Sequence, residues 1–525
     1  MVPRKQILRS SVVVAFFNLL GAFSGILVET SIAANLGLSQ GSDTFYVAYT
    51  VPYIITNLLV ATSQFSLVPF FAMLECSSDE NELWRGFSYV GNVLFLGLGT
   101  IAVVGAGTTP WVIRGIAPGL TPQQHALATQ LSRWLFLIII PAGIGEVLRS
   151  FLLSRHYFAI STASGSIRNV TAIGVILLGF PRYGPYSIFL GYLAGYLLQL
   201  AILGLRLLTA FRPKYFLTLT ARGKAFRNLR GAGTAQLAGA VGWQGVVVVE
   251  RIIASFLPAG TLTALNYGFR ILGTLSELLG GSVGTAAMPG LSRAVARQEH
   301  QEQRRILRDT LGISLALLSP MLVFCLLLNQ EIVRLIFQRG NFTPAATRLM
   351  AMVLFFYSWS LLPFAFIRIL SFCLFARNES GLFLRMALLL YSLNVGFDLL
   401  YVGVFRFGAK SIPMGLLSSL VITSWLVFRR NLCELRNVLD RTLAVFSLKV
   451  LGAGLFSALV VWSLRRRVAP PLSSRGVFVY LCLLCGAGSL VFLAGLVATR
   501  AFARPVWALL GRGGSPPPDS QPSVS

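Results

Sequence analysis

The chain contains one long apolar pattern twice, first as TPQQHALATQLSRWLFLIIIPAGIGEVLRSFLLSR at residues 121–155 and again as TPAATRLMAMVLFFYSWSLLPFAFIRILSFCLFAR at residues 343–377. The copies align without a gap at an offset of 222 residues, and both begin with Thr-Pro, carry a central proline and end in arginine. Further upstream, Glu29 recurs as Glu250 at an offset of 221. A nearly constant offset over so much of the chain indicates an internal duplication.

The composition points to a membrane protein. Of the 525 residues, 55% are hydrophobic and only 12% are charged, about half the charged fraction of a soluble domain. This excludes a soluble enzyme, a secreted disulfide scaffold and a disordered chain, because too few polar residues remain to cover a soluble surface. Backbone polar groups in lipid must be satisfied within the segment, which favours helices. We therefore predict an all-α, polytopic membrane protein.

Apolar runs long enough to span a membrane, at about 20 residues each, recur about fourteen times. They lie at residues 10–36, 44–74, 86–110, 128–153, 159–180, 185–209, 231–257, 263–289, 307–328, 345–376, 382–405, 413–430, 443–463 and 474–500. With the duplication, these runs predict two six-helix lobes of the same direction, followed by two C-terminal helices. The expected divisions are an N-lobe at 1–210, a basic cytoplasmic loop at 211–230, a C-lobe at 231–430, helices 13 and 14 at 431–500, and a disordered tail at 501–525.

Parallel duplicated lobes are typical of transporters that bind their substrate between the lobes and work by alternating access. A duplicated scaffold that binds lipid or partner proteins without transport is the alternative reading. The chain has no GxxxxGK[ST] motif, catalytic triad or metal-ligand spacing. We therefore expect a transporter and not an enzyme, with no cofactor, driven by a Na⁺ or H⁺ gradient, the membrane potential or substrate flux.

The net charge of +26 is explained by membrane topology. Basic residues cluster in alternate loops between the apolar runs, and the positive-inside rule places those loops in the cytoplasm. This argues against nucleic acid as a partner and favours contact with anionic membrane lipids. An even number of spans then puts both termini in the cytoplasm. The run Arg465–Arg467 is the one loop that opposes this orientation.

Charged residues inside the apolar runs are candidate functional groups, since each costs about 2.5–3.5 kcal/mol at the centre of a spanning helix. Glu146 and Arg149 are spaced i,i+3 and are expected to pair with each other. Arg270 has no acidic residue within one helical turn, and Glu277 is two turns away. A guanidinium binds phosphate in a bidentate manner. Arg270 therefore either contacts an anionic substrate or pairs with an acid from another helix.

A second polar group lies on the eleventh apolar run. Asn394 and Asp398 are spaced i,i+4 and share one helix face, and Glu250 belongs to the same predicted lobe. Their oxygen atoms would suit Na⁺ or a proton relay and would not suit soft metals. A buried, hydrogen-bonded helix contact explains the same spacing equally well.

Several blocks occur in the order in which they are found in the lipid II flippase family, MurJ/MviN, and the chain resembles that family from about residue 5 to 500. The blocks are DTFYVAYTVP at 43–52, FSLVP at 65–69, APGL at 117–120, LSR at 131–133, ALNYGFR at 264–270 and RGNFTP at 339–344. The family belongs to the multidrug/oligosaccharidyl-lipid/polysaccharide exporter superfamily. The resemblance implies fourteen helices, a central cationic cavity for an undecaprenyl-pyrophosphate sugar, and a groove for the lipid tail formed by the last two helices.

The resemblance also implies roles for individual residues. It implies that Arg270, Asp43 and Glu29 bind substrate, and that Glu250, Asn394 and Asp398 bind a cation, with Glu250 in place of an aspartate. The implied partners are a polyprenyl-linked glycan lipid and membrane lipids, and the implied setting is the bacterial inner membrane, with the chain as a monomer.

The chain departs from the family in its N-lobe. Arginines of the family's first helix fall here on about Ala22 and Val28, and a pair in its second helix falls on Thr56 and Asn57. Arg270 is left with Arg149 or Arg168 to assist it. Either the positive charge has moved within a lipid II flippase, or the chain moves a different lipid-linked glycan or amphiphile. A cation-coupled multidrug-type antiporter of the same superfamily is the alternative function.

Overall fold

A computed structural model describes residues 4–75, 80–220, 226, 229, 244–377, 379–430, 432–471 and 473–499. The elements of the described part are all helical, with no strands. The helices are α1 (Arg4–Leu36), α2 (Gln40–Thr62), α3 (Val68–Glu75), α4 (Glu80–Ile116), α5 (Pro122–Leu135), α6 (Ile139–Ser154), α7 (Phe158–Tyr183), α8 (Tyr186–Ala210), α10 (Thr261–Leu275), α11 (Ser282–Ala296), α12 (His300–Leu327), α13 (Asn329–Phe337), α14 (Pro344–Trp359), α15 (Leu361–Ala376), α16 (Ser380–Leu399), α17 (Ser411–Arg429), α18 (Leu435–Val438), α19 (Arg441–Arg467) and α20 (Ser474–Ala498).

Short segments of altered winding join several of these helices, and residues 244–254 are also helical. Three are π-helical: η1 (Ser63–Leu67), η3 (Ser276–Gly281) and η4 (Leu400–Val404). Three are 3₁₀-helical: η2 (Phe136–Ile138), η5 (Gly408–Lys410) and η6 (Leu432–Glu434).

The duplication seen in the sequence recurs in the ends of the helices. The run α2–η1–α3 occupies 40–75 and the run α10–η3–α11 occupies 261–296, so both ends are displaced by 221 residues. The run α5–η2–α6 begins at 122 and ends at 154, while α14 begins at 344 and α15 ends at 376, a displacement of 222. The two halves therefore share helix boundaries.

The repeated Thr-Pro dipeptide begins a helix in both copies. Thr121 accepts a hydrogen bond on Oγ1 from the backbone N–H of Gln124 at 3.4 Å, and Thr343 accepts one from Ala346 at 3.2 Å. The proline that follows each threonine occupies the first helical position, where its missing N–H leaves no acceptor unsatisfied. The shared dipeptide is thus an N-terminal cap.

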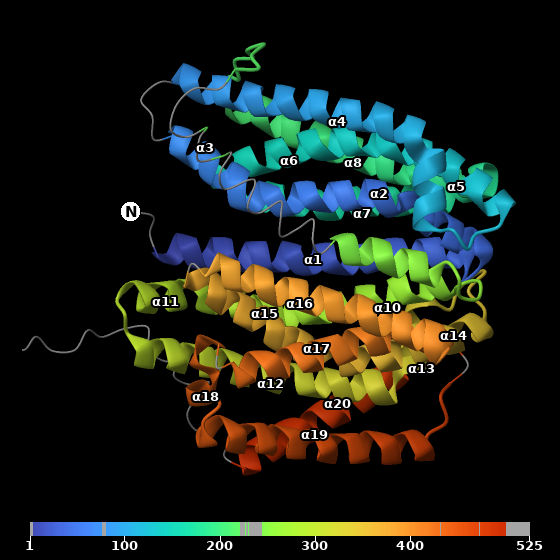
Figure 1. The fold of residues 1–525 in the computed structure, drawn as a ribbon, viewed down its shortest axis with the longest axis vertical. Helices are drawn as coiled ribbons and strands as arrows, with labels where there is room; N and C mark the ends of the chain where they lie inside the picture. Colours follow the sequence, from blue (N-terminus) through green and yellow to red (C-terminus); the bar gives the residue numbers. More distant parts are fainter. Residues whose placement is uncertain are drawn as a thin grey trace, which may run out of the picture. The chain divides into compact units, whose positions relative to one another are not determined.

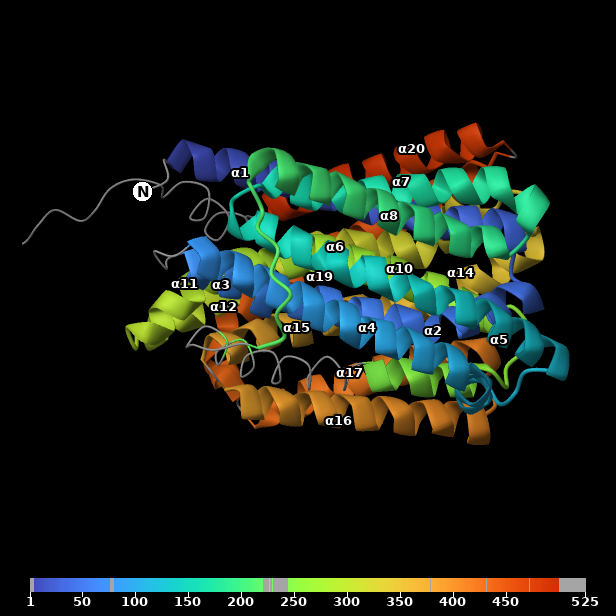
Figure 2. The same ribbon diagram turned by 90° about the horizontal axis from the view of Figure 1, so that it is seen from above.

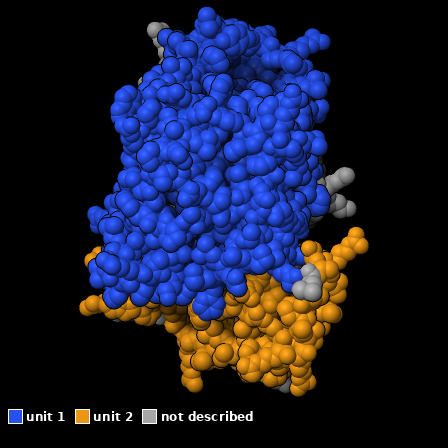
Figure 3. Space-filling model, turned by 90° about the vertical axis from the view of Figure 1, so that its right-hand side faces the viewer, with its two compact units in different colours: residues 1–274, 333–357, 384–419 blue, residues 275–332, 358–383, 420–525 orange. Residues whose placement is uncertain are grey.

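The described residues divide into two compact units, shown in different colours in Figure 3. Unit 1 comprises 1–274, 333–357 and 384–419, and unit 2 comprises 275–332, 358–383 and 420–525. In unit 1, α7 packs against α1 and α8, and α6 packs against α4 and α8 (Figures 1 and 2). In unit 2, α12 packs against α11, α15 and α19, and α19 packs against α20.

Eleven of the described helical segments are long and apolar enough to cross a membrane, or up to twelve if the bent pair of α14 and α15 counts as one span. The prediction of an all-α, polytopic membrane protein is confirmed. The count of fourteen and the division into lobes stay predictions. The predicted tail at 501–525, most of the basic loop beyond 220 and the first part of the run at 231–257 lie outside the described residues.

Candidate functional site

Arg270 lies on α10, in the second half of the helix, and its side chain is exposed. Its guanidinium lies against the backbone of Gly25 on α1: a Cβ atom added to Gly25 would stand 2.6 Å from Nη2 of Arg270. Only a glycine leaves this space open. The guanidinium of Arg270 is therefore accessible while in close contact with a neighbouring helix.

Glu29 is the acid with which the Arg270 guanidinium interacts electrostatically. The two side chains are not among the ion pairs within 4.0 Å that the described residues form. The carboxylate of Glu29 instead accepts a hydrogen bond from the hydroxyl of Tyr46, whose ring packs edge-on against Tyr267. Glu277 forms an ion pair with Arg368. The positive charge of Arg270 is thus left without a direct partner among the described residues.

Asp43 lies at the start of α2 and is buried. Its carboxylate accepts hydrogen bonds from the backbone N–H of Gly260 at 2.6 Å, the backbone N–H of Thr263 at 2.9 Å and the hydroxyl of Thr263 at 2.6 Å. These donors lie at the beginning of α10, where N–H groups have no partner within the helix and where negative charge is favoured. Asp43 therefore fixes the start of the helix that carries Arg270.

The RGNFTP block makes a second contact in this region, with the C-terminal end of α1. The backbone N–H of Asn341 donates to the carbonyl of Ala34 at 2.8 Å, and its side-chain amide donates to the carbonyl of Asn35 at 2.6 Å. Gly340 has a φ of +54° and lies so close to Ala34 that a Cβ atom would meet the carbonyl oxygen. Together with Asp43, this contact holds the C-terminal end of α1 and the start of α10 in place.

The second predicted site contains buried polar atoms without partners. Asn394 and Asp398 on α16 are 2% and 0% exposed, and both polar side-chain atoms of each lack a hydrogen bond in the structure. Glu250 is within electrostatic range of Asp398, and Tyr357 is within range of both carboxylates. Buried polar groups without partners are rare because each carries the full cost of desolvation.

Neighbouring residues shape this second site. The Oδ1 atom of Asp398 lies against Gly415 of α17, where a Cβ atom would collide with it. The guanidinium of Arg251 donates to the amide oxygen of Asn266 at 2.6 Å and interacts electrostatically with Glu250. The unpartnered oxygen atoms of Asp398 and Asn394, together with the carboxylate of Glu250, fit a hard cation, because hard cations prefer oxygen ligands.

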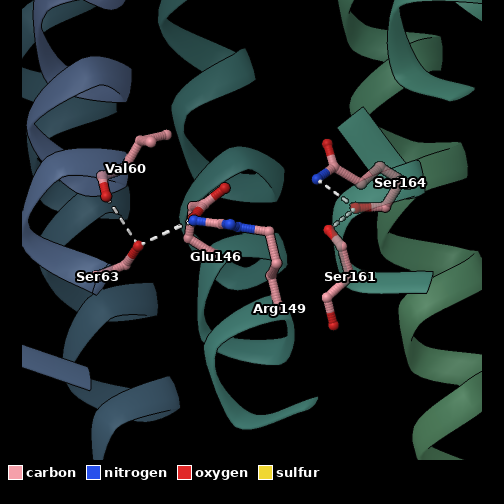
Figure 4. Close-up of polar contacts among 7 residues, drawn as sticks. Val60, Ser63, Glu146, Arg149, Ser161 and Ser164 are labelled. Atoms are coloured by element: carbon pink, nitrogen blue, oxygen red, sulfur yellow. Dashed lines mark hydrogen bonds and ion pairs between the residues drawn. The ribbon is translucent and has the colours of Figure 1, made fainter. Parts of the chain in front are cut away.

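The two other arginines considered for the N-lobe differ in their partners. Arg149 pairs with Glu146 at 2.7 Å between Nη2 and Oε2, and Ser63 donates to the same carboxylate at 3.0 Å (Figure 4). The predicted pair is therefore confirmed. Arg168 on α7 has no carboxylate within ion-pair distance among the described residues, and its guanidinium lies over the ring of Tyr196 at 4.8 Å.

Sequence reasoning missed a set of tyrosines in this region. Tyr46, Tyr49 and Tyr53 recur at helical spacing on α2, and Tyr192 and Tyr196 are spaced i,i+4 on α8. The rings of Tyr49 and Tyr192 stack at 5.1 Å between centroids. The helical spacing of the tyrosines could have shown that they share one face on each helix. The spacing does not show that the tyrosine faces of α2 and α8 contact each other.

These features define a class of protein. Duplicated helical halves that cross a membrane, an accessible arginine between helices and buried polar groups without partners are features of a membrane transporter.

Comparison with known proteins agrees with this class. A family model described as lipid II flippase MurJ matches residues 32–482. A probable lipid II flippase MurJ of Buchnera aphidicola subsp. Baizongia pistaciae (strain Bp) is 23% identical over 94% of this chain and 98% of its own length. The lipid II flippase MurJ of Burkholderia cenocepacia is 25% identical over 71% of this chain and 74% of its own length.

Two solved structures share the fold. Lipid II flippase MurJ in an inward closed conformation has a TM-score of 0.76 at 20% identity, covering 95% of this chain and 100% of that chain. An inward-facing multidrug resistance MATE family transporter of the MOP superfamily has a TM-score of 0.69 at 12% identity, covering 81% of this chain and 94% of that chain.

The chain belongs to the lipid II flippase MurJ family. The resemblance drawn from the sequence blocks is confirmed, and the family is one of transporters and not of catalysts. The roles of the individual site residues stay predictions.

Proposed function

We propose that this protein is a flippase that moves lipid II, or a related polyprenyl-pyrophosphate-linked glycan, across the bacterial inner membrane for cell-wall synthesis. The observation that supports this most strongly is the accessible guanidinium of Arg270, held against Gly25 and without a direct acidic partner among the described residues, in a chain of the lipid II flippase family. A diphosphate offers the pairs of oxygen atoms that a guanidinium binds.

The substrate site combines three of the predicted residues. Arg270 binds phosphate oxygen atoms directly. Glu29, which accepts a hydrogen bond from Tyr46, interacts electrostatically with the guanidinium and would weaken its binding of phosphate enough for release. Asp43 acts as a positioning residue, because its hydrogen bonds to Gly260 and Thr263 fix the helix that carries Arg270.

Cation coupling is assigned to Glu250, Asn394 and Asp398. The buried oxygen atoms of Asn394 and Asp398, together with the partly buried carboxylate of Glu250, would coordinate Na⁺ or hold a proton, and either would compensate the negative charge of the two carboxylates. Binding would favour the arrangement of α16 and residues 244–254 in which these oxygen atoms converge. Release of the cation would favour the opposite state, which is how a gradient biases alternating access.

A small apolar pocket in unit 2 would hold a short part of an acyl or polyprenyl chain. It is lined by α12, α15 and α19, with Leu318, Leu362, Phe366 and Leu443 among its residues. The sequence resemblance placed the tail groove on the last two helices, and of these α19 contributes here.

The proposed orientation has both termini in the cytoplasm and the chain as a monomer. The run Arg465–Arg467 is the apparent exception to the positive-inside rule. Arg465 forms an ion pair with Glu331 at 3.0 Å, and the guanidinium of Arg466 lies over the ring of Trp462 at 3.9 Å. Arginines that contact other side chains of the protein contribute less to membrane orientation than arginines exposed in a loop. We therefore retain the orientation that the basic residues of the other loops predict.

Complementation of a bacterium depleted of its own lipid II flippase tests this function. We expect the wild-type chain to restore growth and Arg270→Ala to abolish rescue at equal protein level in the membrane. Arg297→Ala is the matched control, since Arg297 is exposed at the end of α11 and outside the proposed site. Failure of the wild-type chain to rescue, or rescue by Arg270→Ala equal to wild type, would contradict the proposal.

A cation-coupled multidrug-type antiporter is the second candidate, favoured by the loss of N-lobe arginines at Thr56 and Asn57 and by the fold shared with a MATE transporter. A drug-efflux assay in cells separates the two. Cation-dependent export of lipophilic cations together with failed complementation would favour this second function.

A further inference from the structure

Arg168 is a guanidinium that the proposed substrate site does not use. It lies near the middle of α7, where an unpaired charge is costly and marks a polar pathway. Its closest polar contacts are with Oδ1 of the adjacent Asn169, at 3.4 and 3.5 Å, which is the limit of hydrogen bonding. Asn169 in turn donates to Oγ of Ser24 on α1 at 3.0 Å.

A comparison with Arg149 shows what is unusual about Arg168. Arg149 is also on a membrane helix, but Glu146 accepts from its Nε at 2.8 Å and neutralises it. Glu146 reaches Arg168 only at longer range. Among the described residues, no ion pair involves Arg168, and the face of Tyr196 is its closest compensating group. Arg168 therefore retains hydrogen-bond donors for an external anion.

The tyrosines connect Arg168 with the proposed substrate site. Tyr49 and Tyr192 stack with an angle of 16° between their rings, and both are within electrostatic range of Arg168. Tyr192 is also within range of Glu29 and Arg270. All three residues of this tyrosine cluster, defined as Tyr49, Tyr192 and Tyr196, are partly exposed. The surroundings of Arg168 and Arg270 meet at Gly25, where an added Cβ atom would stand 2.6 Å from Nη2 of Arg270 and 3.8 Å from Nδ2 of Asn169, the neighbour of Arg168.

Helix packing holds Arg168 in this position. A Cβ atom at Gly195 of α8 would stand 2.6 Å from the carbonyl oxygen and 3.0 Å from Cγ of Arg168. The close approach of α8 places the ring of Tyr196 under the guanidinium, with Tyr192 one turn earlier on the same helix. A fixed arginine beside tyrosine rings is a preorganised binding arrangement.

We propose that Arg168 and the tyrosine cluster form a second recognition position for the head group, in which Arg168 binds a phosphate oxygen and the tyrosines contact the adjoining sugar. Tyrosine faces pack on the apolar side of a sugar ring, and their hydroxyls can hydrogen-bond its hydroxyl groups. This inference rests on the proposed flippase function. It assigns to Arg168 part of the positive charge that the family carries at four positions of this lobe. In this chain those positions are Ala22, Val28, Thr56 and Asn57.

The test measures equilibrium binding of two probes to the purified full-length protein in lipid nanodiscs. The probes are lipid II and undecaprenyl pyrophosphate, which has no sugar. Arg168→Gln is expected to raise the Kd of both probes by about tenfold, since it removes a charged hydrogen-bond donor. Arg182→Gln is the matched control, because Arg182 is on the same helix and lies over Tyr183 at 5.6 Å, but is exposed at the helix end. It should leave the Kd of both probes close to that of the wild type.

The tyrosine cluster is tested by Tyr49→Phe and Tyr192→Phe, which keep the rings and remove the hydroxyls. Both should weaken lipid II binding several-fold and leave undecaprenyl pyrophosphate binding unchanged. These conservative variants also test the proposal if Arg168→Gln does not fold, which thermal unfolding of each variant without lipid II will reveal.

Unchanged binding of both probes by a folded Arg168→Gln would overturn the phosphate role. An effect of Arg168→Gln on lipid II alone would also overturn it and would point to an anionic group beyond the diphosphate, such as a carboxylate. Equal binding of lipid II by wild type and both Tyr→Phe variants would overturn the sugar contact. Failure of the wild-type protein to bind either probe would instead contradict the flippase function itself, so the two failures are distinguishable.

Discussion

The carboxylate of Asp43 accepts two hydrogen bonds from Thr263, one from its backbone N–H at 2.9 Å and one from its hydroxyl at 2.6 Å. The two residues lie 220 positions apart in the chain, on α2 and α10. A third bond from Gly260 completes the set. One acidic side chain from the N-terminal half thus supplies the cap of a helix in the C-terminal half.

We expect Asp43→Asn to lower the free energy of unfolding by about 1–3 kcal/mol, because an amide cannot accept on both sides and its NH₂ would face a backbone N–H. Thr263→Val removes only the hydroxyl donor and should have a smaller effect. Thermal and denaturant unfolding of the purified protein would measure both. An effect of Thr263→Val that equals that of Asp43→Asn would show that the backbone bonds contribute little.

Gly25→Ala should impair transport without unfolding the protein. The new methyl group would stand 2.6 Å from Nη2 of Arg270, so it would displace the end of this flexible side chain and leave the helix backbone unchanged. We expect lipid II binding to weaken by about tenfold, as for the loss of one charged contact.

Gly21→Ala is the matched control for Gly25→Ala. It lies one turn earlier on α1, and its added Cβ atom would meet Oγ of Ser166 at an ordinary 3.6 Å. Equilibrium binding in nanodiscs and complementation measure both variants. If the two glycine variants bind and rescue alike, Arg270 does not occupy the position assigned to it.

Asp398→Asn should make thermal stability independent of the coupling cation. The wild-type protein is expected to gain stability as Na⁺ is added in place of choline, by about 2.7 kcal/mol at roughly a hundred times the Kd, because a cation would bind the folded state only. Without Na⁺, the variant should be at least as stable as wild type, since it removes a buried carboxylate whose oxygen atoms lack partners.

Unfolding curves over a range of Na⁺ concentrations and pH would measure this effect. Stabilisation by acidic pH in place of Na⁺ would assign the site to a proton. Asp440→Asn is the comparison, because Asp440 caps α19 and pairs with Arg308 outside the proposed site. A Na⁺ response that persists in Asp398→Asn would place the cation elsewhere.

Arg465→Gln should destabilise the protein by about 3–5 kcal/mol, because it leaves the carboxylate of Glu331, only 5% exposed, without its charged partner. The double variant Arg465→Gln/Glu331→Gln should recover much of this loss. Arg466→Gln, at an exposed neighbouring position, should have little effect. Denaturant unfolding of the wild type and the three variants would test this, and a loss in Arg466→Gln as large as in Arg465→Gln would contradict the importance of the pair.

The architecture could be predicted because it follows from local sequence. Spans are long apolar runs, and the Thr-Pro dipeptides at 121–122 and 343–344 predict helix starts wherever they occur. The ion pair of Glu146 with Arg149 was predictable for the same reason, since both residues lie on one helix turn.

The site was harder to predict because its contacts join helices that are far apart in the sequence. No local pattern connects Asp43 with Thr263, or Tyr49 with Tyr192. The sequence indicated that Arg270 lacks an acid on its own helix, but the space provided by Gly25 depends on how α1 and α10 pack. The unpartnered state of Asp398 likewise depends on what surrounds α16.

The π-helical segments η1 and η3 have a consequence for the symmetry of the two halves. Each introduces an extra residue into a turn, which rotates the following side chains by about 100° relative to a regular helix. The runs 40–75 and 261–296 have matching ends, but η1 begins 23 residues into the first run and η3 only 15 residues into the second. At aligned positions from 15 to 23 residues into each run, the second copy has already passed its π-helical segment and the first has not. The side chains at these positions therefore point in different directions in the two copies. Two helical runs of one ancestral sequence thereby present different side chains at equivalent positions, so the two copies are not interchangeable.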